Sequence, residues 1–412
     1  MGPDRFADLE SRHGRFRTLD YLDRRCLAHP RHFVGDWYGN YVRQEGCRSS
    51  VPEGLNSVAA AVDWDFAQRV AVRVAGREPF SESYHSASLV PDFAELTEQA
   101  EALVAAETGL VSLAGPARAR VTDRAGWIAA NVSSFQRLLR PLLEKFGTRA
   151  NAGALSPLAQ KFAGAEVGMM LGWMSTRVLG QYDLLIIEEE NPTEQDLVYY
   201  VGPNVLAIEK QFAFPPREFR LWLALHEVTH RAQFTGVEWM RPHFLGLVGQ
   251  TLDAADVDPK RFVEAIGRVA TAVRRGENPL ADGGLMGLVA SPQQREVLDQ
   301  VSGMMSLLEG HGDVTMDRAG RGLVPSADRF ARVLRQRRRQ ANGAVKLLQQ
   351  LVGLEAKLNQ YVEGERFIEV VEDAGGAALL ARAWEQPDHL PSLAEIREPD
   401  AWIQRLRPAA TA

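Results

Sequence analysis

The chain has 412 residues, of which 45% are hydrophobic, and it carries a formal net charge of −6. This length allows one large domain or two ordinary ones, and the acidic balance argues against a partner that is nucleic acid or a membrane surface. Two cysteines, Cys26 and Cys47, support neither a disulfide framework nor a cysteine zinc site. With no signal-peptide core and no apolar run that could cross a bilayer, the sequence predicts a cytoplasmic protein.

Residues 1–57 differ in composition from the rest of the chain. They are rich in Arg, contain no Lys and show no sustained helical or strand period. We expect a poorly ordered or dispensable N-terminal extension there, followed by a single domain over residues 58–412. Positions near 236 and 325 are the candidate sub-boundaries of this domain.

Apolar residues spaced three and four apart predict a mainly helical chain from residue 63 onward. Asp63 and Gly76 mark the two ends of the first helix, and Asp92 with Glu95 predicts a capping box for the second, which stops before Gly109. The first four helices are predicted over residues 63–76, 92–109, 122–147 and 156–180. The fourth is apolar on most sides, so we expect it to lie in the core.

Strand signals are concentrated in one part of the chain. Short apolar runs rich in β-forming residues predict strands over residues 183–187, 197–201 and 205–209, with a Gly-Pro-Asn turn before the last. A small sheet of this kind would offer an edge along which an extended peptide could lie. The predicted fold class is therefore mainly α with a small β-sheet (α+β).

The stretch LWLALHEVTHRAQFT, residues 221–235, contains the pattern H-E-x-x-H. Residues four apart share a helical face, so His226 and His230 can bind one ion while Glu227 lies beside it. Two neutral imidazoles, a third protein ligand and an open position for water are typical of catalytic zinc, and the adjacent carboxylate can act as general base. The apolar run before His226 indicates a buried, ligated site rather than two incidental surface histidines.

The rest of the chain is again predicted to be helical. Helices are expected over residues 258–276, 291–318, 326–352 and 354–363, with further segments through 405 and a Gly-rich loop, a possible lid, over 277–290. The arginines of RVLRQRRRQ spread around a helix, which indicates a solvated face rather than a nucleic-acid site.

A third metal ligand has to come from elsewhere, because the residues at positions 233 and 236 do not fit the extended metzincin pattern. In SLLEGHGDVTMD, Glu309 and Asp313 share a helical face, so one can bind the metal while the other accepts a hydrogen bond from a ligating imidazole. His311 lies between them on another face and is the weaker ligand candidate. His243, near an aromatic residue, is a further candidate with a more probable structural role.

Two more expectations concern the same region. Gly310 and Gly312 each cost a helix about 1 kcal/mol relative to Ala, which makes sense where another backbone such as that of the metal helix comes close. An oxyanion stabiliser or substrate contact is also needed, and the candidates are His311 and Tyr361.

Three stretches carry a family resemblance: FRLWLALHEVTHRAQFTGVEWMRPH, MSLLEGHGDVTMD and GLEAKLNQYVEGERF. They look like the bacterial zincin-like metallopeptidases that are labelled "coenzyme F420 biosynthesis associated", and the resemblance covers residues 58–405. It implies a mostly helical minimal-zincin fold, one catalytic Zn²⁺ and peptidase activity. It also implies Glu309 as third ligand and Asp313 as the carboxylate behind an imidazole, as in glutamate-type zincins, although the separation between His230 and Glu309 is longer here.

The sequence therefore predicts a zinc metallopeptidase in which His226, His230 and Glu309 hold Zn²⁺ and Glu227 is the general base. Its partner is a peptide or protein substrate, with no nucleic acid and no membrane, and the oligomeric state is not defined. The alternative is a non-proteolytic zinc-binding scaffold or regulator. Glu227 favours the enzyme, because structural zinc needs no base next to its ligands.

Overall fold

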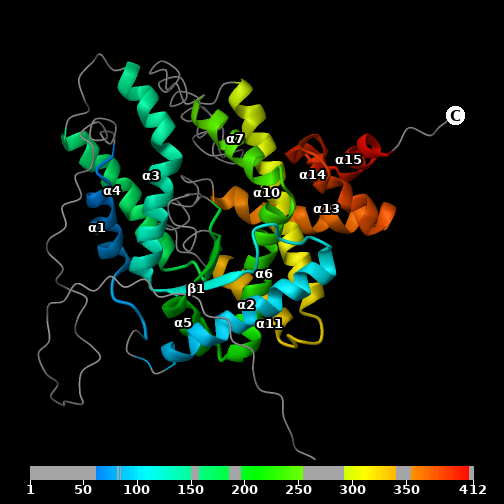
Figure 1. Cartoon of the computed structure of the whole chain (residues 1–412), viewed down its shortest axis with the longest axis horizontal. Helices are drawn as coiled ribbons and strands as arrows, with labels where there is room; N and C mark the ends of the chain where they lie inside the picture. The colour runs from blue at the N-terminus through cyan, green and yellow to red at the C-terminus, as the bar shows by residue number, and fades with distance from the viewer. Residues whose placement is uncertain are drawn as a thin grey trace, which may run out of the picture. The chain divides into compact units, whose positions relative to one another are not determined.

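Helices make up most of the computed structural model of the chain (Figure 1). The structure describes residues 62–80, 83, 85–149, 157–184, 196–253, 292–339 and 354–407. All of them belong to the second of the two units into which the chain divides, Glu53–Ala412. These residues form many helices and one small sheet, which confirms the predicted fold class. The predicted extension over residues 1–57 lies outside the described residues, and the domain boundaries stay predictions.

The sheet has three strands in the order β1-β3-β2. Strand β1 (Arg118–Thr122) is parallel to β3 (Leu197–Val201), and β2 (Gly180–Tyr182) is antiparallel to β3. All residues of β3 are buried, as expected for a central strand that is covered on both faces. Strand β2 is left at an edge of the sheet.

The predicted strand over residues 197–201 is confirmed as β3, but the one over 205–209 is wrong. Residues 205–209 belong to helix α5 (Gly202–Phe212), which has Pro203 in its first turn. A short helix that is buried on most sides has an apolar run like that of a strand, so periodicity alone does not separate the two.

Strand β2 begins at Gly180, the residue at which the fourth helix was predicted to end. Helix α4 (Pro157–Ser175) stops before Gly180, with which β2 begins. The predicted strand over 183–187 starts after β2 has ended, and most of it lies outside the described residues. Strand β1 had no counterpart in the prediction, because its Arg and Ala residues are weak strand formers.

Helix α1 (Trp64–Ala75) begins and ends as predicted and packs against α4. Asp63 accepts a hydrogen bond from the backbone N–H of Phe66 at 2.9 Å, and Gly76 follows the helix with φ at 63°. Three glycines of α4 lie so close to this segment that a Cβ would come within 2.4–2.5 Å of its backbone oxygens. These glycines are Gly164, Gly168 and Gly172.

Helix α2 (Ser86–Thr108) begins before the predicted start and ends at Gly109, as expected. The predicted capping box of Asp92 and Glu95 is wrong, because both carboxylates instead face arginines of helix α6 (Pro216–Gly236). The ion pairs are Asp92–Arg220 and Glu95–Arg217. In these pairs each carboxylate contacts a positively charged guanidinium, whereas in a capping box it would contact only backbone N–H groups.

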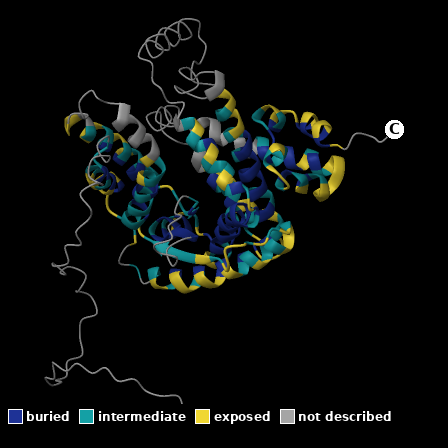
Figure 2. Cartoon of the chain, turned by 45° about the horizontal axis from the view of Figure 1, so that its top comes forward, coloured by how far each residue is buried: buried dark blue, intermediate teal, exposed yellow. Residues whose placement is uncertain are grey.

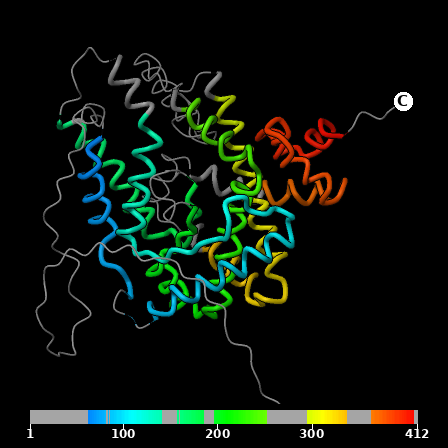
Figure 3. The backbone as a smooth tube through the Cα atoms, viewed as in Figure 1, coloured from blue at the N-terminus to red at the C-terminus, as the bar shows by residue number. Residues whose placement is uncertain are grey.

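Helix α10 (Pro292–Ala319) has nearly the predicted bounds, and α6 (Pro216–Gly236) contains the H-E-x-x-H stretch; both contribute to the main hydrophobic core. Helix α6 is buried along most of its length and contacts α2, β2, α7 (Met240–Asp253) and α10 (Figure 2). Helix α10 runs beside α6 (Figure 3). Through Leu307, α10 also contributes to a second core with Phe367 and Trp402.

The remaining helices connect these parts. They are α3 (Arg124–Arg149), α7 (Met240–Asp253), α11 (Ala327–Arg339), α13 (Leu354–Ala381), α14 (Leu393–Arg397) and α15 (Pro399–Leu406), with short 3-10 helices over Arg382–Trp384 and Pro387–His389. Helix α13 continues past its predicted end at residue 363, because Gly364 lies at a helix contact and does not act as a stop. The helix and loop predicted over 258–290 lie outside the described residues. No described helix has the length and hydrophobicity to span a membrane.

Candidate metal centre

Two imidazoles from consecutive turns of α6 face each other. Nε2 of His226 lies 3.2 Å from Nε2 of His230, and the rings are nearly perpendicular, at 84°. Both side chains are partly exposed, although most of their neighbours on α6 are buried. The four-residue spacing therefore directs two ring nitrogens to one point beside the helix.

Glu309 of α10 brings a third donor to this point. Its Oε2 lies 3.9 Å from Nε2 of His226 and 3.6 Å from Nε2 of His230. The donor atoms of the three residues all lie within 4.8 Å of one another, and within the described ranges this is the one such cluster. A tetrahedral Zn²⁺ with bonds of about 2.0–2.2 Å needs ligand atoms about 3.3–3.5 Å apart, so the donor set fits zinc.

Asp313 lies one helical turn after Glu309, behind the imidazole pair. Its Oδ1 is 3.5 Å from Nδ1 of His226, the ring nitrogen on the far side from Nε2. A carboxylate in this position favours the tautomer that has its proton on Nδ1 and its lone pair on Nε2. Glu309 and Asp313 thus act from one face of α10, as their spacing in the sequence suggests.

Glu227 is buried between α6 and the edge strand β2. Its Oε2 accepts a hydrogen bond from the backbone N–H of Tyr182 at 3.1 Å, and a Cβ on Gly180 would lie 2.7 Å from its Cγ. Burial raises the pKa of Glu227 to about 7, with a further contribution from Glu309, although His230 and the Tyr182 N–H act in the opposite direction. A carboxylate with a pKa near neutrality can both accept and release a proton.

Gln233 is a site residue that sequence reasoning missed. It is fully buried one turn beyond His230, and its Oε1 lies 3.0 Å from Nδ1 of that residue. Its Nε2 lies 3.0 Å from the carbonyl oxygen of Leu308 and 3.0 Å from Nδ1 of His311. The signal in the sequence was its position three residues after a candidate ligand, because side chains at that spacing lie on one helical face and can form a hydrogen bond.

The other candidates are not part of the three-donor cluster as far as the structure describes them. His311 is buried with its ring 5.0 Å from that of Trp384, and burial followed by the charge of His230 lowers its pKa to about 4. His243 lies on α7 beside Trp239. Tyr361 lies on α13, but its side chain is outside the described residues.

The two glycines that flank His311 have different neighbours. A Cβ on Gly312 would lie 3.2 Å from Cε1 of His230, so the backbone of α10 passes close to the imidazoles there. A Cβ on Gly310 would instead lie 2.3 Å from the carbonyl carbon of Gly364, on α13. The prediction that the metal-binding helix α6 comes close is therefore confirmed at Gly312, whereas at Gly310 the close neighbour is α13.

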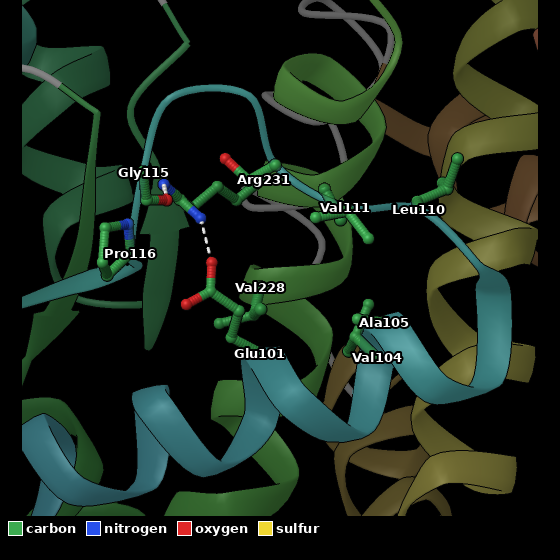
Figure 4. A pocket seen from close by; sticks show the side chains of 11 residues that line it. Glu101, Val104, Ala105, Leu110, Val111, Gly115, Pro116, Val228 and Arg231 are labelled. Atoms are coloured by element: carbon green, nitrogen blue, oxygen red, sulfur yellow. Dashed lines mark hydrogen bonds and ion pairs between the residues drawn. The ribbon is translucent and has the colours of Figure 1, made fainter.

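A cavity of about 240 Å³ lies beside a different face of α6, next to Arg231 (Figure 4). The guanidinium contacts the carboxylates of Glu101 and Asp196, each at 2.6 Å, and donates to the carbonyl of Gly115. Asp196 also accepts a hydrogen bond from the hydroxyl of Tyr182 at 3.1 Å. These ion pairs and hydrogen bonds hold α2 and β2 against α6. Among the described residues, the group of side chains that could bind a metal lies elsewhere, at His226, His230 and Glu309.

Comparison with known proteins places the cluster in a wider context. A family model described as zincin-like metallopeptidase matches residues 62–403. A solved structure from Chloroflexus aurantiacus, described as "a putative hydrolase with a novel fold", is 30% identical, covers 84% of this chain and 100% of that chain, and has a TM-score of 0.63. No curated protein gives a significant match. The family match includes all three donors and Glu227.

Proposed function

Because the chain belongs to the zincin-like metallopeptidase family, we propose that it is a zinc-dependent peptidase of the H-E-x-x-H, glutamate-ligand type. One observation carries the proposal: donor atoms of His226, His230 and Glu309 lie within 4.8 Å of one another, although they come from two helices that are far apart in the sequence. Glu227, next to the first of these ligands, has the position of a general base. A zinc-dependent hydrolase is also consistent with the hydrolase description of the similar solved structure.

The side chains have separate roles in the proposed hydrolysis. Bound Zn²⁺ would supply Lewis acidity, which polarises the substrate carbonyl and brings the pKa of a bound water to about 7. Glu227 accepts a proton from the attacking water and transfers it to the amide nitrogen as the C–N bond breaks. Asp313 keeps Nε2 of His226 directed at the cluster.

We assign substrate binding to the β2 edge of the sheet. Within the described part of the chain, strand β2 pairs with β3 on one side, and on its other side the N–H of Tyr182 meets Glu227. An extended peptide that runs along this edge would have its backbone beside the general base. The Tyr182 N–H already donates to Glu227. Because alternate residues of a β-strand point their N–H groups to the same side, the N–H of Gly180 faces this edge too, and pairing with the substrate depends on it. The partner is thus a peptide or protein, and neither nucleic acid nor a membrane.

A zinc-binding scaffold without peptidase activity is the competing function. Holding a metal requires the ligands and the groups that orient them, but it does not require a buried carboxylate next to the first ligand. Glu227 is such a carboxylate. The enzyme is therefore the better-supported function.

Metal analysis combined with the Glu227→Gln variant tests the proposal. We expect the wild type to bind one zinc and to hydrolyse members of a peptide library, detected by mass spectrometry. Glu227→Gln should bind zinc with similar affinity but lose about 10²–10⁴-fold in turnover, the contribution of a general base. Full turnover by this variant would refute the assignment of Glu227. A wild type that binds no zinc would refute the metal site, and one that binds zinc but cleaves nothing would favour the scaffold.

A further inference from the structure

We propose that Gln233 is a positioning residue that fixes which nitrogen of His230 meets the metal and that couples His230 to the helix carrying Glu309. The inference rests on the metal site proposed above, but it concerns a residue outside the H-E-x-x-H pattern. Gln233 is fully buried on α6, and both ends of its amide have partners at 3.0 Å.

The hydrogen bonds of this amide have only one consistent polarity. One amide atom lies 3.0 Å from the carbonyl oxygen of Leu308, which can only accept, so that atom must be the NH₂ group. The same NH₂ lies 3.0 Å from Nδ1 of His311, which therefore accepts as well. The amide oxygen faces Nδ1 of His230 at 3.0 Å and can only accept, so Nδ1 of His230 carries a proton.

This polarity selects the metal-binding tautomer of His230. A neutral imidazole has one donor and one acceptor nitrogen, so a proton on Nδ1 leaves the lone pair on Nε2. That nitrogen lies 3.2 Å from Nε2 of His226 and 3.6 Å from Oε2 of Glu309. His226 receives the same preference from the carboxylate of Asp313, whereas His230 receives it from a neutral amide.

Gln233 also connects the two helices that supply the ligands. Leu308 immediately precedes Glu309, so the bond from Gln233 to the Leu308 carbonyl joins α6 to α10 next to the third donor. If the amide reversed, its oxygen would face that carbonyl oxygen and both N–H bonds would be lost. The arrangement therefore fixes the separation between the imidazole pair and Glu309 as well as the ring orientation.

Two substitutions of Gln233 separate positioning from packing. Gln233→Glu keeps an acceptor for Nδ1 of His230 but removes both N–H donors. Gln233→Leu has a similar volume and removes every polar partner. Thr229→Val is the matched control, because Thr229 is also fully buried on α6 and its hydroxyl donates to the Leu225 carbonyl at 2.7 Å, away from the cluster.

Zinc dissociation constants measured by chelator competition give the first readout. We expect Gln233→Leu to weaken zinc binding about 10–100-fold, the usual effect of losing a group behind a ligand. Gln233→Glu should lose less affinity than Gln233→Leu, because it loses the bond to Leu308 but keeps the acceptor for His230, and Thr229→Val should leave the affinity unchanged. Equal losses in both Gln233 variants would show that the acceptor for His230 contributes nothing and would overturn the inference, and so would unchanged affinity in Gln233→Leu.

The tautomer of His230 gives a second readout that does not depend on activity or on a variant that folds. Although burial opposes protonation, contacts with Glu309, Glu227 and Gln233 raise the pKa of metal-free His230 to about 9, so the spectrum is recorded above that pH, where the imidazole is neutral. Nitrogen-15 NMR of the metal-free wild type should then show the proton of neutral His230 on Nδ1. A neutral imidazole with its proton on Nε2 would overturn the inference whatever the variants do. Failure of the proposed function is distinct from this outcome, because the wild type would then bind no zinc although the tautomer could still be read.

Discussion

The backbone N–H of Tyr182 donates to the carboxylate of Glu227 at 3.1 Å, which ties the proposed general base to the edge strand of the sheet. Glu227 is therefore oriented by a strand rather than by another side chain on its own helix. In the proposed enzyme the same short strand also receives the substrate. A change in β2 should accordingly alter turnover more than metal binding.

Gly180→Ala tests this separation. The added Cβ would lie 2.7 Å from Cγ and Oε1 of Glu227, so the carboxylate has to move. A displacement of about 1 Å in a reacting group costs about 10²-fold in rate, so we expect a fall of that size in kcat with little change in zinc affinity. Gly246→Ala on α7, where no atom lies within 4 Å of the new Cβ, is the control. Equal kcat values for the two variants would contradict the role of β2.

The two carboxylates of α10 should differ in their effect on zinc. Asp313→Ala removes a group that orients His226, and we expect zinc affinity to fall about 10–100-fold. Glu309→Ala removes a donor and should cost more than that. Competition with a chelator measures both, and Asp299→Ala, an exposed carboxylate of the same helix, should bind zinc like the wild type. A larger loss in Asp313→Ala than in Glu309→Ala would reverse the two assignments.

Gly310→Ala should destabilise the fold. Its Cβ would lie 2.3 Å from the backbone of Gly364, and backbone cannot rotate away as a side chain can. Overpacking of this kind costs about 1–3 kcal/mol. Gly249→Ala on α7 meets no atom within 4 Å and should instead be neutral or stabilising by up to about 1 kcal/mol, because Ala favours helix. Urea unfolding with a chelator present measures both, and equal midpoints would show that α10 and α13 can separate at little cost.

The stability of the metal-free protein should depend on pH through His311. Burial, followed by the charge of His230, lowers the pKa of His311 to about 4 from its ordinary value of 6.5. Between these values the unfolded chain binds a proton that the folded protein does not, so stability is lost as the pH falls from 6.5 towards 4. We expect His311→Asn to lose less stability than the wild type between pH 7 and pH 4.5 in urea titrations. Parallel losses in the two proteins would mean that His311 titrates normally.

Much of the candidate metal centre could be predicted from the sequence, because its signals are local. The H-E-x-x-H spacing and the start of α10 at Pro292 depend only on neighbours within a few residues. The pairing of Glu309 with Asp313 follows from the same helical period. These features needed no knowledge of how the helices pack.

The errors arose where a distant partner decided the outcome. Asp92 pairs with an arginine of α6, so it was unavailable for the capping box that its own neighbourhood predicts. Gly364 lies against Gly310, so it continues α13 instead of ending it. Gln233 was not predicted as a site residue, because two of its three hydrogen-bond partners, Leu308 and His311, lie on α10. Tertiary contacts of this kind cannot be read from the period of one segment.

The close approach of Gly310 to Gly364 also bears on how this protein could be divided or recombined. Helix α10 presents Glu309 to the imidazoles while the residue next to it rests directly on the main chain of α13. A shortened chain that ended before Leu354 would keep every proposed ligand but would lose α13, against which the residue next to Glu309 packs. The carboxyl-terminal helices thus support the helix that carries the third proposed ligand, and a chimaera that contained only the ligand-bearing segments would lack this support.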